Sequence, residues 1–454
     1  MASTLEIARP GDAAGFNSGI ARAAAVVSFA ALAVKLAGML KETAVARVYG
    51  RSDAMDAFLV AALVPALLVN LIAESMNQAL IPTLVRVREQ QGRRRAQELL
   101  SSAMLWTCVL LLSVALAVAA AARRFFPLLA SHFAAPKLAL SIHLFYGLLP
   151  MVLITGVAAN CTSVLNTEGE FALPALAPIV NSVLIVAGVL VFGSRFGIWA
   201  MVWATLAGAA VHALLVVSRM KTYGYRFLLR WYGQTEAIRE VSRQYGAVLL
   251  SGAVASGGLI VDQSMAAMLP AGSVSALAYA GRFVSVALTL VAGTLSTALT
   301  PSLSHLVAQH DWRACRSALR TWSRIAAVAS IPIAALLIAG APFLVRLAFQ
   351  RGAFGPSDTA VVARALVMYA LQIPFFAMSR VSYRLLIAMR RTDLVLACGV
   401  LNLVLDIVLN LALMRWFGVA GIALATSLWT FATYLFLGYW ARRLLRESER
   451  ESPC

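Results

Sequence analysis

The residues of this sequence that could do chemistry are ionisable side chains embedded in long apolar runs. The clearest stretch reads VKLAGMLKETAVARVYGRSDAMDAFLVAALVP, and it carries Lys35, Lys41, Glu42, Arg47 and Asp56. A charged side chain at membrane depth is costly and usually faces a water-filled cavity or a partner. On a helix, Lys35 and Glu42 share one face, and Lys41 lies about a quarter-turn away. This stretch therefore predicts a polar cavity inside an apolar protein.

Deep cations outnumber deep anions along the whole chain, which predicts an anionic ligand. Arginine forks suit phosphate, and lysine contributes a point charge. The cations that we predict to line the cavity and bind a phosphate-bearing substrate are Lys35, Lys41, Arg282, Arg380 and Arg384. The acidic residues that we predict to line or gate the cavity are Asp56, Glu74, Asp262 and Asp406.

Structural interpretations compete with these functional ones. Lys41, Glu42 and Arg47 could be anchors that reach the membrane interface. Asp56 follows GRSD at a helix start, where a carboxylate complements the helix dipole. Glu74 could pair with a lysine of the first helix or reach the interface, and an arginine at 380 or 384 could pair with Asp406 as structural glue.

The composition places most of the surface in lipid. Of 454 residues, 61% are hydrophobic and only 13% are charged, whereas soluble domains are nearer half apolar and a quarter charged. The apolar runs do not alternate with polar residues, so they predict helices and exclude a barrel. The net charge of +18 follows membrane topology, because arginine and lysine collect in short connections, and nucleic-acid binding is not expected.

The remaining motifs exclude several classes of function. The cysteines are scattered and odd in number, so they predict neither disulfides nor a metal cluster. No Gly-rich phosphate loop, catalytic triad or acidic metal cluster occurs, so the sequence predicts no enzyme, metal or cofactor. Because the sequence predicts no nucleotide hydrolysis, any energy that the protein uses would come from an ion gradient, a partner reaction or the membrane potential.

A spanning helix needs about 20 apolar residues. By that measure the predicted spans are about twelve: 19–48, 54–85, 98–122, 139–165, 172–193, 197–219, 244–268, 274–307, 323–346, 359–389, 393–414 and 419–441. The first, second, eighth and tenth are longer than a flat crossing needs, so we expect them to tilt, bend or protrude. The predicted organisation is a tail at 1–18, an N-lobe at 19–219, a linker at 220–243, a C-lobe at 244–441 and a tail at 442–454.

Basic residues predict that both termini are cytoplasmic, with even-numbered connections inside. The basic-rich connections and tail contain Arg86, Arg88, Arg93, Arg94, Arg95, Arg219, Lys221, Arg226, Arg230, Arg239, Arg243, Arg313, Arg316, Arg320, Arg442, Arg443, Arg446 and Arg450. The opposite connections are sparser.

The two halves of the chain resemble each other. ALIPTLV (79–85) recurs as ALTPSLS (298–304), FGIWAMVWAT (196–205) recurs as FGVAGIALAT (417–426), and Asn181 corresponds to Asn402. Several matches in order at nearly constant separation predict two repeats of six helices. Because six is even, the repeats have the same orientation, as in transporters whose site lies between the halves.

The opening stretch, continued through NLIAESMNQALIPTLV (70–85), resembles the MurJ/MviN family, the lipid II flippases of the MOP transporter superfamily. YAGRF (279–283) and FQRGAFGPSDT (349–359) add to this resemblance, which spans about residues 19–440. It implies two six-helix lobes around a central cavity that opens alternately to each side, and a saccharide on undecaprenyl pyrophosphate as cargo. The family's cationic cavity positions map onto Lys35, Lys41, Arg282 and Arg380, and its acidic positions onto Asp56 and Glu74.

The sequence departs from the family at several positions. Two basic residues common in the second helix are Val69 and Asn70 here, and acidic neighbours of the eighth-helix arginine are Gly281 and Ser285. Family members often carry two further C-terminal helices. A dedicated exopolysaccharide or O-antigen-like unit therefore competes with lipid II as the cargo.

These observations predict a multi-pass flippase of the bacterial inner membrane that moves a polyprenyl-pyrophosphate-linked saccharide to the periplasmic leaflet by alternating access. Membrane lipid and envelope glycosyltransferases are the other expected partners. The alternatives are an ion-coupled exporter of small molecules or drugs, which needs an anionic cavity, and a non-transporting scaffold, in which the buried cations should be fully paired.

Overall fold

The computed structural model describes residues 10–451, and within that range every regular element is a helix. Helices are expected, because long apolar segments must satisfy their backbone hydrogen bonds internally when water is absent. The helices are α1 (Pro10–Tyr49), α2 (Asp53–Leu68), η1 (Val69–Glu74), α3 (Ser75–Gln91), α4 (Arg93–Leu129), α5 (Ala135–Thr167), α6 (Ala172–Leu176), α7 (Pro178–Phe196), α8 (Trp199–Thr222), α9 (Glu236–Ala267), α10 (Ser273–Ala308), α11 (Trp312–Phe349), α12 (Pro356–Ala370), α13 (Gln372–Ala388), α14 (Thr392–Phe417) and α15 (Val419–Glu451).

Each of the twelve predicted spans falls on one of these helices or on a contiguous series of them. Ten spans are long and apolar enough to cross a membrane within the part of the chain that was searched. The two predicted spans outside that set correspond to α1 and α9, so the predicted count of twelve is not confirmed. The all-helical, multi-pass architecture itself is confirmed.

Two of the four overlong spans, the second and the tenth, are interrupted. The second span contains Pro65 and then the short π-helix η1, and it continues as α3. Such π segments interrupt regular helices, often at functional sites. The tenth span is divided at Leu371, where α12 ends and α13 begins.

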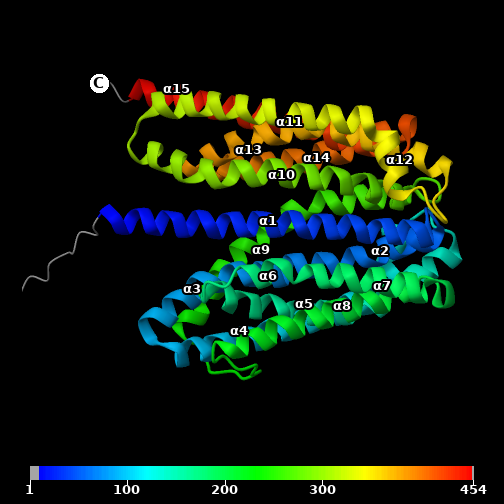
Figure 1. Cartoon of the computed structure of the whole chain (residues 1–454), viewed down its shortest axis with the longest axis horizontal. Coiled ribbons are helices and arrows are strands. Elements are labelled where there is room, and N and C mark those ends of the chain that lie inside the picture. Colours follow the sequence, from blue (N-terminus) through cyan, green and yellow to red (C-terminus); the bar gives the residue numbers. More distant parts are fainter. Residues whose placement is uncertain (1–9, 452–454) are drawn as a thin grey trace, which may run out of the picture.

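Two groups of antiparallel helices form an N-lobe (α1–α8) and a C-lobe (α10–α15), joined by α9 (Figure 1). We call the end that holds the α1–α2 turn the outer end, and the opposite end the inner end. The chain enters α1 and leaves α15 at the inner end (Figure 1). The ribbons of the two lobes converge at the outer end and diverge toward the inner end.

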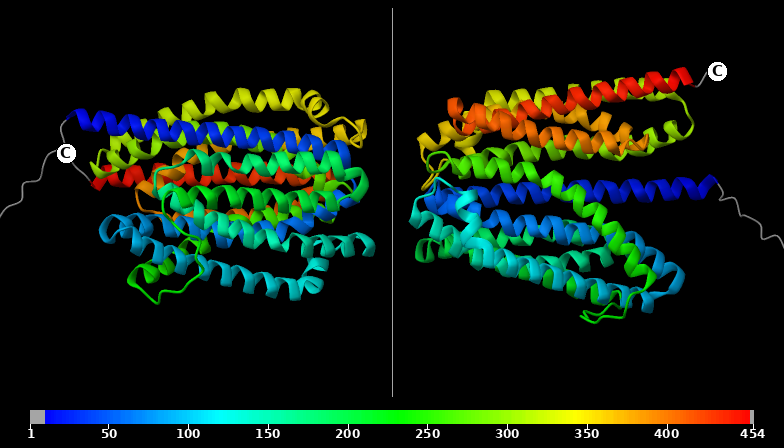
Figure 2. Two further views of the ribbon diagram at one scale, coloured as in Figure 1. Left: turned by 60° about the horizontal axis from the view of Figure 1, so that its bottom comes forward. Right: turned by 180° about the vertical axis from the view of Figure 1, so that it is seen from behind.

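Helix α9 runs obliquely from one lobe to the other, as the rear view in Figure 2 shows. At its inner end Tyr245 packs edge-to-face on Trp106 of α4 at 5.2 Å, and Glu240 pairs with Arg86 of α3. Toward its outer end Asp262 accepts a hydrogen bond from Asn410 of α14 in the C-lobe at 2.9 Å. The predicted boundary between lobes at residue 244 therefore falls inside a helix that contacts both.

The two predicted repeats place corresponding residues at corresponding contacts. Asn181 on α7 lies against Gly208 of the following helix α8. Its counterpart Asn402 on α14 accepts a hydrogen bond from Thr433 of the following helix α15 at 2.8 Å. Each asparagine thus packs on the last helix of its own repeat.

Candidate functional site

A buried carboxylate joins the two lobes just inside the outer end. Glu42 on α1 is 4% exposed, and its Oε1 lies 3.0 Å from the Nζ of its neighbour Lys41 and 3.0 Å from the Nη2 of Arg282 on α10. At 1.5 Å per residue, Arg282 is about 14 Å along α10 from the outer end. The predicted cavity cations Lys41 and Arg282 are therefore brought together, and they meet on one anion.

Lys35 contributes a further positive charge to this group. It is half-buried and lies two helical turns inward of Glu42 on α1. Three positive charges against one negative charge leave a surplus of two. We call Lys35, Lys41, Glu42 and Arg282 the inter-lobe charge cluster.

The other two predicted cations are arranged differently. The Arg380 guanidinium on α13 stacks over the rings of Phe376 at 4.4 Å and Tyr383 at 5.6 Å. Arg384, one turn further along, is half-buried. The anticipated ion pair between these arginines and Asp406 is absent from the described contacts, because Asp406 faces other partners.

Asp56 makes a second junction between the lobes, at the outer end itself. Its carboxylate is 1% exposed and accepts hydrogen bonds from the backbone amides of Gly272 at 2.7 Å and Ser275 at 2.9 Å. These amides open helix α10, whose first N–H groups have no intrahelical acceptor. Asp56 does lie in the first turn of its own helix α2, as expected, but it also caps a helix of the opposite lobe.

Lys137, from the start of α5, completes this junction. Its Nζ lies 3.0 Å from Asp56 and 2.6 Å from Asp53. No local pattern in the sequence predicts a pair between Lys137 and Asp56, because they are 81 positions apart. We call Asp56, Lys137 and the α10 N-terminus the outer junction.

Further contacts fasten the lobes around the outer junction. Arg51 donates to the Gly272 carbonyl at 2.9 Å and pairs with Asp358 of α12 at 3.2 Å. The buried Tyr279 hydroxyl donates to the Gly50 carbonyl at 2.9 Å. All described hydrogen bonds and ion pairs between α1–α8 and α10–α15 join residues 42–56 to residues 272–282 and 353–358.

The turn between α11 and α12 also contributes to this fastening, since the Ala353 amide donates to the Arg47 carbonyl at 2.9 Å. Gly352 has φ +62° and lies directly against that carbonyl, where an added Cβ would clash. The QRGAF element, noted in the sequence, thus forms part of the closed outer end. Arg47 itself is exposed.

The acidic residues Asp262 and Asp406 come together where α9 packs against α14. The amide nitrogen of Asn410 donates to Asp262 at 2.9 Å and to Asp406 at 3.0 Å, and Thr426 donates to Asp262 at 3.4 Å. Asn410 Oδ1 has no hydrogen-bond partner in the described part of the chain. A buried and a half-buried carboxylate with amide and hydroxyl oxygens can hold a hard cation or share a proton. Glu74 lies apart from them, half-buried at the end of η1.

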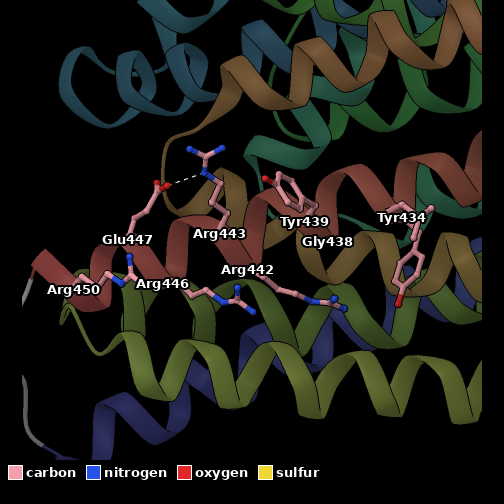
Figure 3. A pocket seen from close by; sticks show the side chains of 9 residues that line it. Tyr434, Gly438, Tyr439, Arg442, Arg443, Arg446, Glu447 and Arg450 are labelled. Atoms are coloured by element: carbon pink, nitrogen blue, oxygen red, sulfur yellow. Dashed lines mark hydrogen bonds and ion pairs between the residues drawn. The ribbon is translucent and has the colours of Figure 1, made fainter.

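A groove of about 690 Å³ runs along the inner end of α15, lined by Tyr434, Leu435, Gly438, Tyr439, Arg442, Arg443, Arg446, Glu447 and Arg450. Figure 3 shows Arg442 and Arg446 on one side of α15 and Arg443 beside Glu447 on the other. One helix lines it, and its arginines belong to the basic tail noted in the sequence. It is separate from the inter-lobe charge cluster.

The family model described as lipid II flippase MurJ matches residues 45–451 of this chain. The chain belongs to this family. The match begins three residues after Glu42 and includes all parts of the outer junction: Asp56, Lys137 and the N-terminus of α10. The architecture of the MurJ family therefore applies to nearly the whole described structure.

Individual relatives agree with this assignment. The probable lipid II flippase MurJ of Buchnera aphidicola is 24% identical over 416 residues, covering 90% of this chain and 81% of that protein. The lipid II flippase MurJ of Burkholderia cenocepacia is 28% identical over 365 residues, covering 77% and 70%.

Solved structures show the same fold. A lipid II flippase MurJ in an inward closed conformation superposes with a TM-score of 0.79 at 21% identity, covering 92% of this chain and 87% of that one. An inward-facing multidrug resistance MATE family transporter of the MOP superfamily superposes with a TM-score of 0.76 at 14% identity, covering 94% and 100%. At these identities the structures support the MOP-type fold alone.

Sequence reasoning missed three contributors to these clusters. Glu42 was recognised on the face of Lys35 but not as the anion between Lys41 and Arg282, although its position directly after Lys41 was a usable signal. Asn410, which follows Asp406 at i+4, had a weaker signal of the same kind. Lys137 had none.

Proposed function

We propose that this chain is a flippase that moves a saccharide linked to a polyprenyl pyrophosphate, of the lipid II type, between the leaflets of the bacterial inner membrane. Membership of the MurJ family supports this, and one structural observation carries it. Lys41 and Arg282, from opposite lobes, meet in a cluster with two surplus positive charges. Such a cluster suits a pyrophosphate, which offers several anionic oxygens to lysine and arginine donors.

The arrangement suggests how the cargo is loaded. The polar contacts between lobes lie at the outer end, so a headgroup entering between the lobes from the inner end reaches Lys35 first and then Lys41 with Arg282. Beyond these cations the outer junction blocks passage. Transport then requires the outer junction to open while the inner end closes, with the pyrophosphate held at the boundary between the lobes.

The orientation of the chain in the membrane follows from the basic residues. The connections rich in arginine, including the end of α15, lie at the inner end, and cytoplasmic loops carry such an excess. We therefore assign the inner end and both termini to the cytoplasm, and the direction of flipping to the periplasmic leaflet. Recruitment of envelope glycosyltransferases stays a prediction.

The decisive experiment measures flipping of a fluorescent undecaprenyl-pyrophosphate saccharide in proteoliposomes. Lys41→Ala and Arg282→Ala should each reduce the rate by about a hundredfold, since each removes a charge-assisted contact to the cargo. Arg415→Ala, which removes an exposed arginine at the outer end of α14, is the matched control and should flip at the wild-type rate. Normal flipping by both cluster variants at normal folding would refute the proposal.

Complementation of a strain depleted of its lipid II flippase separates the cargoes. Growth would support lipid II itself as the cargo. Flipping in vitro without complementation would support a dedicated polysaccharide unit on the same carrier.

A small-molecule exporter driven by ions remains the second candidate, because Asp262 and Asp406 form an acidic pair bridged by Asn410 on a fold shared with a MATE transporter. Dye efflux that depends on Asp262 and not on Arg282 would favour it. A non-transporting scaffold fits less well, because one carboxylate cannot neutralise the three cations of the inter-lobe charge cluster.

A further inference from the structure

We propose that Glu42 is an internal counter-anion that occupies the cationic site in the absence of cargo and that the pyrophosphate must displace from Arg282. This inference rests on the proposed function, since it concerns how the same site loads and releases its ligand. Glu42 is on this view a positioning residue, which acts through the cations and does not touch the cargo.

The geometry of the three partners carries the argument. One oxygen of Glu42 accepts from both Lys41 and Arg282, and these cations come from different lobes. The Glu42 side chain is 5% exposed, whereas the Arg282 side chain is 44% exposed. The carboxylate is therefore buried, and an approaching anion meets the guanidinium before it reaches the carboxylate.

Arg282 has donors left for a ligand. A guanidinium carries five N–H donors in a planar fork, and the described ion pair uses Nη2 toward Glu42. A phosphate can first bind the free donors and then compete for the donor that Glu42 holds. Carboxylate and phosphate oxygens accept the same charge-assisted hydrogen bonds, but a pyrophosphate brings more oxygens and more charge. When the phosphate replaces Glu42, Arg282 therefore keeps the same kind of charge-assisted hydrogen bond.

The exchange would serve both loading and release. Without a ligand, Glu42 offsets part of the repulsion among Lys35, Lys41 and Arg282, which would otherwise oppose contact between α1 and α10. With a ligand, the pyrophosphate takes over that role. When the cargo has crossed, recapture of Arg282 by Glu42 favours release, because a buried carboxylate that has lost one of its two cationic partners is less stable.

The test compares Glu42→Gln with wild type in two assays. In the first, binding of inorganic pyrophosphate to the purified protein is measured by calorimetry. Glu42→Gln should bind it about tenfold more tightly, because one competing negative charge is removed. In the second, the flipping assay, the same variant should show a lower KM and a lower kcat, because release is slowed.

Two further variants keep the test decisive. Glu42→Asp retains the charge on a shorter side chain and should fall between wild type and Glu42→Gln, which gives a second reading if Glu42→Gln folds poorly. Glu170→Gln is the matched control. It removes a carboxylate that pairs with Arg219 at 2.8 Å at the inner end, and it should leave pyrophosphate affinity unchanged.

The outcomes separate this inference from the proposed function. Unchanged or weaker pyrophosphate binding in Glu42→Gln, including no binding by any variant, overturns the counter-anion role, and so does a parallel loss of binding and turnover. Tighter binding in Glu42→Gln without lipid flipping by any variant would support the counter-anion role and overturn the flippase proposal.

Discussion

The inter-lobe charge cluster and the outer junction both use helix α10, but their charges are balanced differently. At the outer junction the carboxylate of Asp56 is matched by Lys137 and by two backbone amides at the start of α10. About 14 Å further in along α10, Glu42 faces more positive charge than it can neutralise. A buried charge that its partners neutralise indicates a structural contact between the lobes. A buried group of side chains with a net charge indicates a binding site for a ligand of opposite charge.

The sharpest way to break this comparison is to remove the fastening. Asp56→Ala should lower the free energy of unfolding by about 3 kcal/mol, because it leaves two buried amides without their acceptor and removes the buried one of the two carboxylates that pair with Lys137. The measurement is a thermal melt of the purified protein. Asp53→Ala is the control, since Asp53 also contacts Lys137 but is 64% exposed. An equal fall in both variants would contradict the fastening role.

A second test separates charge from geometry in the inter-lobe charge cluster. Arg282→Lys keeps the positive charge but loses the planar fork, so flipping should fall by about tenfold, less than for Arg282→Ala. Thermal stability should change little in Arg282→Lys and should fall in Arg282→Ala, because the buried Glu42 then loses one of its two cationic partners. A rate for Arg282→Lys equal to that of Arg282→Ala would show that charge alone does not bind the headgroup.

Asp262 and Asp406 form a site of net negative charge, in contrast to the net positive inter-lobe charge cluster. If Asp262 and Asp406 hold a hard cation, sodium should raise the melting temperature of wild type by a few degrees relative to choline. Asp262→Asn should abolish most of that shift, because it removes one of two carboxylates. Wild type that melts at the same temperature in both salts would favour a shared proton.

The smallest effect is expected at the rim of the outer end. Arg51 and Asp358 are a partly buried pair at 3.2 Å, so Asp358→Asn should cost about 1 kcal/mol of stability. Asp358→Asn should also increase only slightly the rate at which a thiol reagent labels cysteines introduced at the outer end, because the outer end stays closed. A loss as large as that of Asp56→Ala would mean that the fastening is concentrated at the rim.

Much of the fold could be predicted from the sequence, because hydropathy and length define a spanning helix without reference to its neighbours. The predicted spans coincide with helices, including the divided one around Leu371. The oblique course of α9 could not be predicted, because nothing within Glu236–Ala267 says that its two ends pack on different lobes. The predicted boundary at 244 reflects that limit.

The candidate site divides in the same way. Lys41 and Arg282 were predicted from the cost of charge in apolar helices, and they do meet. The pairing of Asp406 with an arginine was wrong, because Asn410 and Asp262 lie closer to it, and that proximity depends on how α9 packs against α14. Glu42 was visible on the correct face, but its role depends on a residue 240 positions away.

The sequence by itself determined that this chain is a bundle of membrane helices with surplus positive charge at depth, because those properties follow from residue types and local spacing. Only the tertiary structure decided which charges are neutralised. Hydrogen bonds act over about 3 Å. The roles of Asp56 in joining the lobes and of Glu42 beside the cations therefore depend on contacts between segments that are distant in the chain.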